Sequence, residues 1–140
     1  MQPKDQGPSP YVVDIEGTTL ANENFRTAAW TGKYFQLTLM TIPVGGEVGL
    51  EIHPDTDQFL RLEQGKAKVM MGRAKDELSQ TWQAEDDWAI IVPAGTWHNV
   101  VNVGQEPLKL YSIYAPPHHP HGTVHKTHED AMAAEEAEEH

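Results

Sequence analysis

Polar and apolar side chains alternate along several short stretches of this chain, and glycine, proline or asparagine residues separate these stretches. Alternation with a period of two is typical of a β-strand that buries one face. The clearest stretches are 34–42, 58–63, 66–71 and 108–114. Many short strands broken by turns predict an all-β protein, an antiparallel barrel or jelly roll.

The two ends of the chain follow other patterns. Residues 1–10 contain three prolines and a glycine, which predicts a flexible arm or a segment draped across a neighbour. Residues 11–15 predict a short first strand, and 20–30 a helical turn or loop. Thr127 could cap a last helix built from alanine and glutamate, but the acidic end of that helix opposes the helix dipole, so a solvated tail is the favoured alternative.

Length and composition indicate one small domain. A chain of 140 residues is long enough to bury a core, and we expect an arm at 1–10, a barrel at 11–116 and a separate C-terminal segment at 117–140. The absence of cysteine excludes disulfides and thiolate metal sites. The polar start and the lack of a long apolar run predict a cytoplasmic protein.

The charge distribution argues against two classes of partner. The formal net charge is -11, and the segment from His128 onward contains six acidic residues and neither lysine nor arginine. The rest of the chain is therefore only mildly acidic. Nucleic acids and anionic membranes need a basic face, so we expect neither as a partner.

Three polar side chains form the first half of a candidate metal site. Glu51 and His53 are two residues apart, so they point the same way if the chain is extended. Gln58 follows the turn at 54–57 and lies at the head of an apolar row. A buried polar group there is costly unless it is paired or coordinated, and a metal ion would satisfy it.

His98 is the fourth candidate ligand. It opens a strand after the turn that contains Pro93 and Gly95. These residues and Asn102 resemble the second conserved motif of the cupin superfamily, G-x5-P-x-G-x2-H-x3-N, with Asp87 in place of the opening glycine.

The first cupin motif, G-x5-H-x-H-x4-E-x6-G, is matched less completely. Its second histidine corresponds to His53 and its closing glycine to Gly65. Glu51 stands where a histidine is usual, and Gln58 where a glutamate is usual. The resemblance implies a double-stranded β-helix (jelly-roll) barrel of the small single-domain type.

The exchanged residues leave the charge of the ligand set unchanged. Two imidazoles, one carboxylate and one amide carry one negative charge, as do three imidazoles and one carboxylate. Such a set suits one divalent ion, Mn, Fe, Zn or Ni, and does not select among them. The alternative is a cupin pocket that has lost its metal. Asp55 and Asp57 are possible substitute ligands, but Asp57 has the wrong parity for the pocket.

Six of the eight histidines follow residue 117. The segment His118–His128 predicts a second metal site, a lid over the barrel mouth or a polar tail, and the sequence leaves these alternatives open. Trp97 directly precedes His98, so we expect it to face away from the pocket.

The resemblance implies a metal-dependent enzyme of the dioxygenase, isomerase or lyase class that acts on a small polar or carbonyl-containing molecule. No residue is identified as the general base. The alternative is a non-catalytic cupin that binds or senses a small molecule. The resemblance also makes a homodimer plausible.

Overall fold

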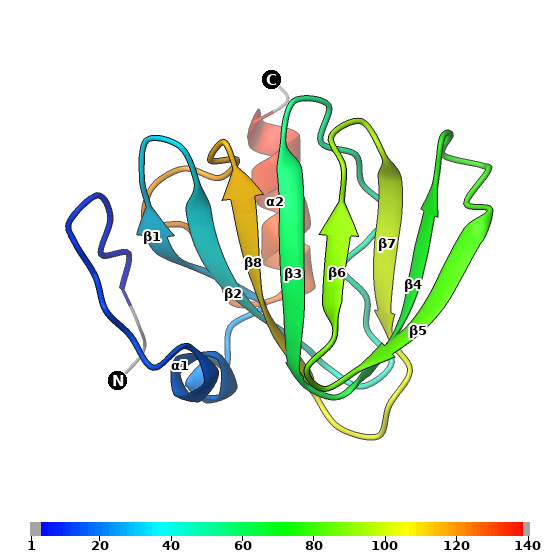
Figure 1. Ribbon diagram of the computed structural model, residues 1–140, viewed down its shortest axis with the longest axis horizontal. Coiled ribbons are helices and arrows are strands. Elements are labelled where there is room, and N and C mark those ends of the chain that lie inside the picture. Colours follow the sequence, from blue (N-terminus) through cyan, green and yellow to red (C-terminus); the bar gives the residue numbers. More distant parts are fainter. Residues whose placement is uncertain (1–3, 139–140) are drawn as a thin grey trace.

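The structure is a computed structural model that describes residues 4–138, and within them it contains nine strands and two helices. The strands form two antiparallel sheets, ordered β6-β3-β8-β2-β1-β9 and β5-β4-β7, that wrap a common interior (Figure 1). The predicted all-β jelly-roll barrel is therefore confirmed. The strands are β1 (Arg26–Thr31), β2 (Gln36–Ile42), β3 (Asp57–Gln64), β4 (Lys66–Gly72), β5 (Gln80–Glu85), β6 (Ala89–Val92), β7 (Trp97–Asn102), β8 (Leu108–Ala115) and β9 (Val124–His125).

The inner face of the larger sheet divides into a polar and an apolar part. Strand β8 pairs with β2 and β3, and the register places Gln58, Tyr114 and Gln36 in one row across the three strands. The rows further from this end contain Leu60, Leu62, Leu110, Met40 and Ile42, all nearly fully buried. The apolar rows supply the hydrophobic core, and the polar row leaves one end of the barrel interior available for chemistry.

Strand β2 turns its more polar face inward. The sequence pattern placed Phe35, Leu37 and Leu39 on one face of this strand, and the apolar face is the one expected to be buried. Gln36 and Thr38 are fully buried; on the apolar face Leu39 is also fully buried, but Phe35 is 45% exposed. The interior of this barrel is thus partly polar, which the alternation alone could not reveal.

Segment 43–56 closes the smaller sheet without forming a long strand. The Val48 amide donates to the Val100 carbonyl at 2.9 Å, and the Asn102 amide donates to the Gly46 carbonyl at 2.9 Å. The segment therefore lies antiparallel along β7 and covers the edge of that strand. Covering an edge removes unpaired backbone groups from solvent and completes the barrel wall.

Helix α1 (Ile15–Ala21) overlaps the end of the strand expected at 11–15 and the start of the helical turn or loop expected at 20–30. The Asp14 side chain accepts a hydrogen bond from the Gly17 amide and so caps the helix. The predicted strand at 11–15 is wrong, because these residues pair with no other strand in the described chain. The predicted loop at 20–30 is also wrong in part, because β1 begins at Arg26.

The described part of the N-terminal arm lies along β1. The Asp5 carboxylate accepts hydrogen bonds from the backbone amides of Thr31 and Gly122, each at 2.9 Å. The Gln6 amide donates to the Ala29 carbonyl at 2.9 Å. Residues 1–3 of the predicted arm lie outside the described residues.

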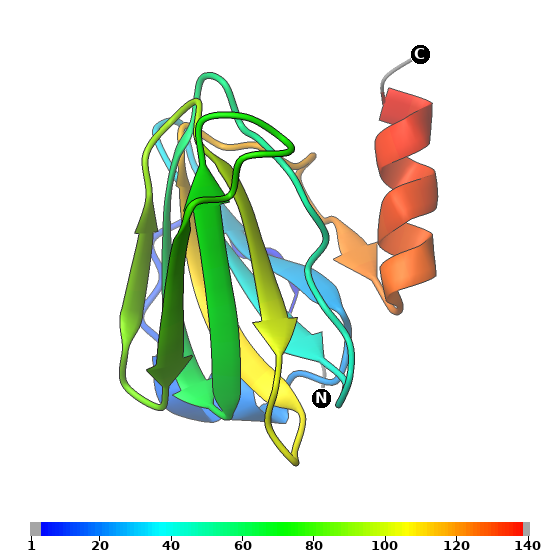
Figure 2. The same cartoon turned by 90° about the vertical axis from the view of Figure 1, so that its right-hand side faces the viewer.

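Helix α2 (His128–Glu138) follows β9 at the other end of the chain. It stands beside the barrel, next to β9 (Figure 2). The Thr127 hydroxyl accepts a hydrogen bond from the Asp130 amide at 3.1 Å, so the proposed cap is formed. Ala131 is buried in the core cluster, and the helix rather than the solvated tail is present up to Glu138. Neither helix of the described chain is long and apolar enough to span a membrane.

Asn102, at the end of β7, joins three backbone segments. Its buried side-chain amide donates toward the carbonyls of Ile42, Pro43 and Glu106, at 3.0 to 3.2 Å. Its side-chain oxygen accepts from the Gly104 amide at 2.9 Å.

We predict that Asn102→Ala lowers the free energy of unfolding by about 2–3 kcal/mol, because it leaves several buried carbonyls without a donor. Urea denaturation of the metal-free protein measures this loss. Gln105→Ala, at an exposed position in the same turn, is the matched control and should leave the midpoint unchanged. Equal midpoints for the two variants would contradict the role given to Asn102.

Candidate metal centre

Three of the four predicted ligands converge at the polar end of the barrel interior. One ligand atom from each of Glu51, His53 and His98 lies within 4.8 Å of the others. Glu51 and His98 are joined by two backbone hydrogen bonds of 3.0 Å, one in each direction, which places their side chains on the same face. The Gly95 amide donates to the His53 carbonyl at 2.9 Å and so ties His53 to the turn before β7.

The backbone selects the tautomer of His98. Its Nδ1 lies 3.0 Å from the Thr96 carbonyl oxygen, which can only accept a hydrogen bond, so Nδ1 carries the proton in the neutral ring. The other ring nitrogen, Nε2, lies 3.7 Å from Glu51 Oε1. A metal-binding histidine usually has its second nitrogen held in this manner.

Gln58 lies on β3, next to Tyr114 in the register of the sheet. Its side-chain nitrogen donates to the Ser112 hydroxyl at 2.8 Å. The other side-chain atom, Oε1, is buried without a hydrogen-bond partner among the described residues. The amide oxygen is therefore available as a ligand.

The donor set fits a divalent metal ion. Besides Gln58 Oε1, the buried atoms that lack a hydrogen bond in the described chain include Glu51 Oε1, both ring nitrogens of His53 and His98 Nε2. Buried polar atoms without partners are costly, and they are rarely found gathered at one place. His53 Nε2 lies 3.5 Å from Glu51 Oε1. Ligands at about 2.1 Å from a common ion are separated by about 3.0–4.2 Å.

The electrostatics of the cluster favour an ionised carboxylate. Burial by itself would raise the pKa of Glu51, but the His53 and His98 imidazoles beside it hold that pKa well below its ordinary value. A carboxylate that is ionised, buried and next to two imidazoles is ready to bind a cation without first losing a proton.

Aromatic and histidine rings surround the candidate ligands. The His53 ring lies 4.2 Å from the His118 ring and 5.6 Å from the Tyr114 ring, measured between centroids. Burial lowers the pKa of His118 to about 4, and His53 contributes to this shift. Burial also lowers the pKa of His119 to about 2, with a further contribution from Arg26. Both rings are therefore neutral near pH 7.

Gln36 positions these two histidines. Its side-chain oxygen accepts from the His119 amide at 2.9 Å and the His118 amide at 3.2 Å, and its nitrogen donates to the His119 carbonyl at 2.8 Å. The sequence left three alternatives for the His-rich segment: a second metal site, a lid or a polar tail. The part at His118–His119 reaches the pocket, since the His118 ring lies against the His53 ring. Among the described residues it adds no second cluster of three metal-binding side chains.

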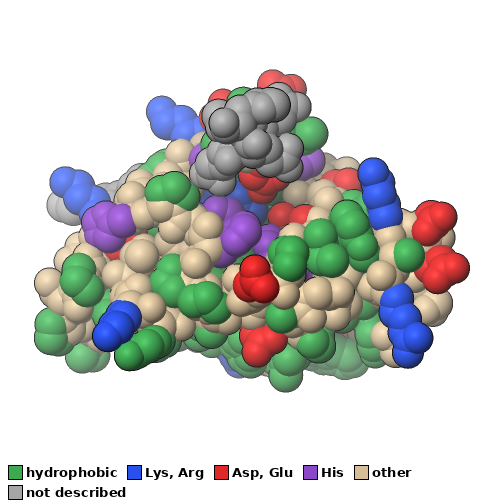
Figure 3. Space-filling model, turned by 90° about the horizontal axis from the view of Figure 1, so that it is seen from above, with side chains coloured by type: hydrophobic (Ala, Val, Ile, Leu, Met, Phe, Trp, Pro, Cys, Tyr) green, Lys and Arg blue, Asp and Glu red, His purple; other side chains and the backbone are tan. Residues whose placement is uncertain are grey.

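A cavity of about 490 Å³ opens beside the candidate ligands. Glu51 and His53 line it together with Trp97, which we expected to face away from the pocket. Because Trp97 lines this cavity, the prediction that it faces away from the pocket is wrong. Histidine and acidic side chains lie near the middle of the upper face of the molecule (Figure 3). The remaining lining residues are Leu50, Ile52, Lys75, His118 and Glu135.

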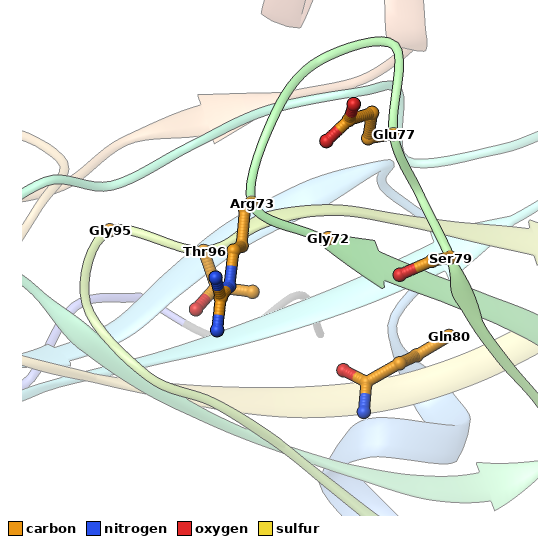
Figure 4. A pocket seen from close by; sticks show the side chains of 7 residues that line it. All are labelled: Gly72, Arg73, Glu77, Ser79, Gln80, Gly95 and Thr96. Atoms are coloured by element: carbon orange, nitrogen blue, oxygen red, sulfur yellow. The ribbon is translucent and has the colours of Figure 1, made fainter.

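A second groove, of about 530 Å³, lies between the β4–β5 loop and the turn before β7 (Figure 4). Arg73 extends beside Thr96 there, and Glu77 and Gln80 line the other side. The groove contains none of the candidate ligands, whereas Glu51 and His53 line the cavity described above.

Some residues of the site were not identified from the sequence. Ser112 and Tyr114 were placed correctly on the inward side of β8 by the alternation, but nothing in the pattern marked them as neighbours of a ligand. Arg26 was hidden because its stretch was interpreted as a loop. Gln36 was hidden because its face of β2 was not expected to be buried.

The chain is similar to several known proteins. It is 62% identical over 133 residues to YrkC of Bacillus subtilis, covering 95% of this chain and 72% of that protein. The crystal structure of BH2720 from Bacillus halodurans, at 59% identity and a TM-score of 0.92, covers 93% of this chain and 98% of that one. Bacillus subtilis oxalate decarboxylase, studied for its Mn(II) centres, has 28% identity and a TM-score of 0.57 over 64% of this chain and 23% of its own.

A family model described as the cupin domain matches residues 38–114. This range contains every candidate metal ligand and strands β3 to β7 in full. It covers more than half of the chain, in agreement with the jelly-roll topology, and the chain therefore belongs to the cupin domain family.

Proposed function

We propose that the protein is a metal-binding cupin that holds one divalent ion, Mn, Fe, Zn or Ni, through Glu51, His53, Gln58 and His98. The observation that carries this proposal is the set of buried, unpartnered ligand atoms at the polar end of the barrel. The Mn(II) centres named for Bacillus subtilis oxalate decarboxylase, a structural neighbour, support a first-row metal in this fold.

We further propose that the protein is an enzyme of the dioxygenase, isomerase or lyase class. When bound, the ion would act as a Lewis acid on a carbonyl or enediol oxygen. The cavity accommodates a small molecule, and the apolar side chains of Leu50, Ile52 and Trp97 along it would exclude water from the bound molecule. The neutral His118 ring next to His53 is placed to accept or return a proton at one of its nitrogens.

A non-catalytic cupin that binds or senses a small molecule is the second candidate. The cavity favours it equally, because a pocket of this size serves binding as well as catalysis. Under either proposal the partner is a small molecule, and the protein is expected to form a homodimer.

The first prediction concerns the ligands. His53→Ala and His98→Ala should each lose most of the bound metal while remaining folded, because each removes a ring nitrogen that faces the cluster. Elemental analysis of protein purified without a histidine tag measures the metal content, and far-ultraviolet circular dichroism checks the fold. His121→Ala, at an exposed position outside the cluster, is the control and should keep its metal. Unchanged metal content in both ligand variants would refute the assignment.

The second prediction separates the enzyme from the binder. Wild-type protein loaded with matched metal should turn over a member of a panel of diketones and enediols, and oxygen uptake would distinguish an oxygenase from an isomerase or lyase. Gln58→Glu should keep its metal but change the rate by about 10-fold or more, because it adds a negative charge to the ligand set. A folded, metal-loaded protein that binds panel members but never converts them supports the sensing alternative.

The neutral histidines also link stability to pH. His118 and His119 have pKa values of about 4 and about 2 in the folded protein, both below the ordinary value of 6.5. Between pH 6.5 and the lower pKa values of the folded protein, the unfolded chain binds more protons than the folded one, so acid favours unfolding. The two buried neutral rings cost no folding stability above about pH 6.5. The free energy of unfolding decreases as the pH falls from 6.5 through the pKa values of the folded protein.

We therefore predict that the free energy of unfolding of the metal-free protein falls as the pH is lowered from 6.5 to 4. His118→Gln should show a shallower fall, because the variant removes one group that gains a proton on unfolding. Denaturant titrations at several pH values provide the measurement. Gln105→Ala, which changes an exposed side chain that does not titrate, should keep the wild-type slope; a His118→Gln slope equal to it would count against a buried neutral His118.

A further inference from the structure

A buried arginine lies behind the wall of the cavity. Arg26, the first residue of β1, is only 1% exposed, and its Nε has no hydrogen-bond partner among the described residues. Its Nη1 lies 3.3 Å from Nδ1 of His125, the residue paired with it on β9. A guanidinium has five N–H donors, and burying its charge without acceptors costs free energy. The Phe25 ring, 5.4 Å from the guanidinium carbon, and the charge of Glu51 compensate this cost in part, and the unpartnered Nε remains able to donate to an anionic group.

One carboxylate already approaches this arginine. Glu135 Oε1, from helix α2, lies 3.9 Å from Arg26 Nη1, and the Glu135 side chain is 41% exposed. Glu135 also lines the cavity beside the candidate metal ligands. Its carboxylate thus stands between the space that a small molecule would occupy and the buried guanidinium.

The helix that carries Glu135 is anchored at its opposite end. The His128 ring packs on the Phe25 ring with centroids 5.1 Å apart, and Ala131 is buried in the core. Glu135 lies one turn beyond Ala131, on the half-buried part of the helix. The first turns of α2 are therefore held by contacts other than the one between Glu135 and Arg26.

The charges around the cavity favour an anionic ligand. Glu51 is the carboxylate among the candidate metal ligands, and Arg26 and a divalent ion would together outweigh the charges of Glu51 and Glu135. His118 and His119 are neutral and do not alter this balance. A small molecule that brings its own carboxylate would meet an uncompensated positive charge.

We propose that Arg26 is the binding position for a carboxylate group of the small-molecule ligand, and that Glu135 occupies this position until the ligand displaces it. A two-headed ligand follows, with a carbonyl or hydroxyl oxygen at the metal and a carboxylate at the guanidinium. Arginine pairs with a carboxylate through two parallel hydrogen bonds, a geometry that the monodentate 3.9 Å contact with Glu135 does not use. The proposal rests on the proposed function, because it places the ligand in the same cavity.

The test uses pyruvate and pyruvamide, two probes that share a carbonyl and differ in the carboxylate. Isothermal titration calorimetry on the full-length protein measures their dissociation constants with and without added Mn²⁺. Wild type should bind pyruvate more tightly than pyruvamide. Glu135→Gln should bind pyruvate about 5-fold more tightly, because the competing carboxylate is gone, and should bind pyruvamide as wild type does.

A matched control removes the effect of net charge. Glu129→Gln makes the same charge change on an exposed face of the same helix and should leave both constants unchanged. Arg26→Gln should weaken pyruvate binding about 10-fold, to the level of pyruvamide. Because Arg26 is buried, a thermal unfolding curve must accompany that variant; if it does not fold, the comparison of Glu135→Gln with Glu129→Gln decides the question.

Three results would overturn the proposal. They are equal affinities of the wild-type protein for the two probes, equal effects of Glu135→Gln and Glu129→Gln, and no pyruvate binding by the wild type or any variant. Metal content is measured separately on the same samples. A protein that lacks metal but still prefers pyruvate would refute the proposed metal centre and support the carboxylate site at Arg26. A metal-loaded protein without that preference would support the metal centre and refute the carboxylate site.

Discussion

The two backbone hydrogen bonds between Glu51 and His98 are the constraint on which the site depends. They join a segment outside the main strands to the start of β7, and so bring a carboxylate and an imidazole onto one face. His53 is tied to the same turn through the Gly95 amide. The ligands are thus placed by the backbone, before any ion is present, which reduces the entropy lost on binding.

The barrel interior is organised as an apolar half and a polar half. Leucine, isoleucine and methionine side chains supply the hydrophobic free energy at one end, while glutamine, tyrosine, serine and threonine line the other. The buried polar side chains are held by specific partners, such as Gln58 by Ser112 and Gln36 by the backbone at His118–His119. This division gives a small domain an apolar core and a polar pocket within one barrel.

Much of the fold could be predicted from the sequence, because alternation and turn residues are local signals. They identified the long strands and the inward face of β3. They failed at α1, where a single capping aspartate decided the outcome, and at β2, where burial of a polar face depended on residues more than seventy positions away. The convergence of Glu51, His53 and His98 followed from motif spacing. Arg26 and Glu135 carry no such spacing, and their proximity exists only in three dimensions.

Segment 43–56, which carries Glu51 and His53, is held along β7 by a few backbone bonds rather than by a continuous ladder. Such a segment can open locally at a much smaller free energy than the sheets around it. His98, on β7 itself, would stay in place during such an opening. The rate at which an ion enters or leaves would then be governed by the local opening of segment 43–56. A bound ion would exchange while the barrel remains folded.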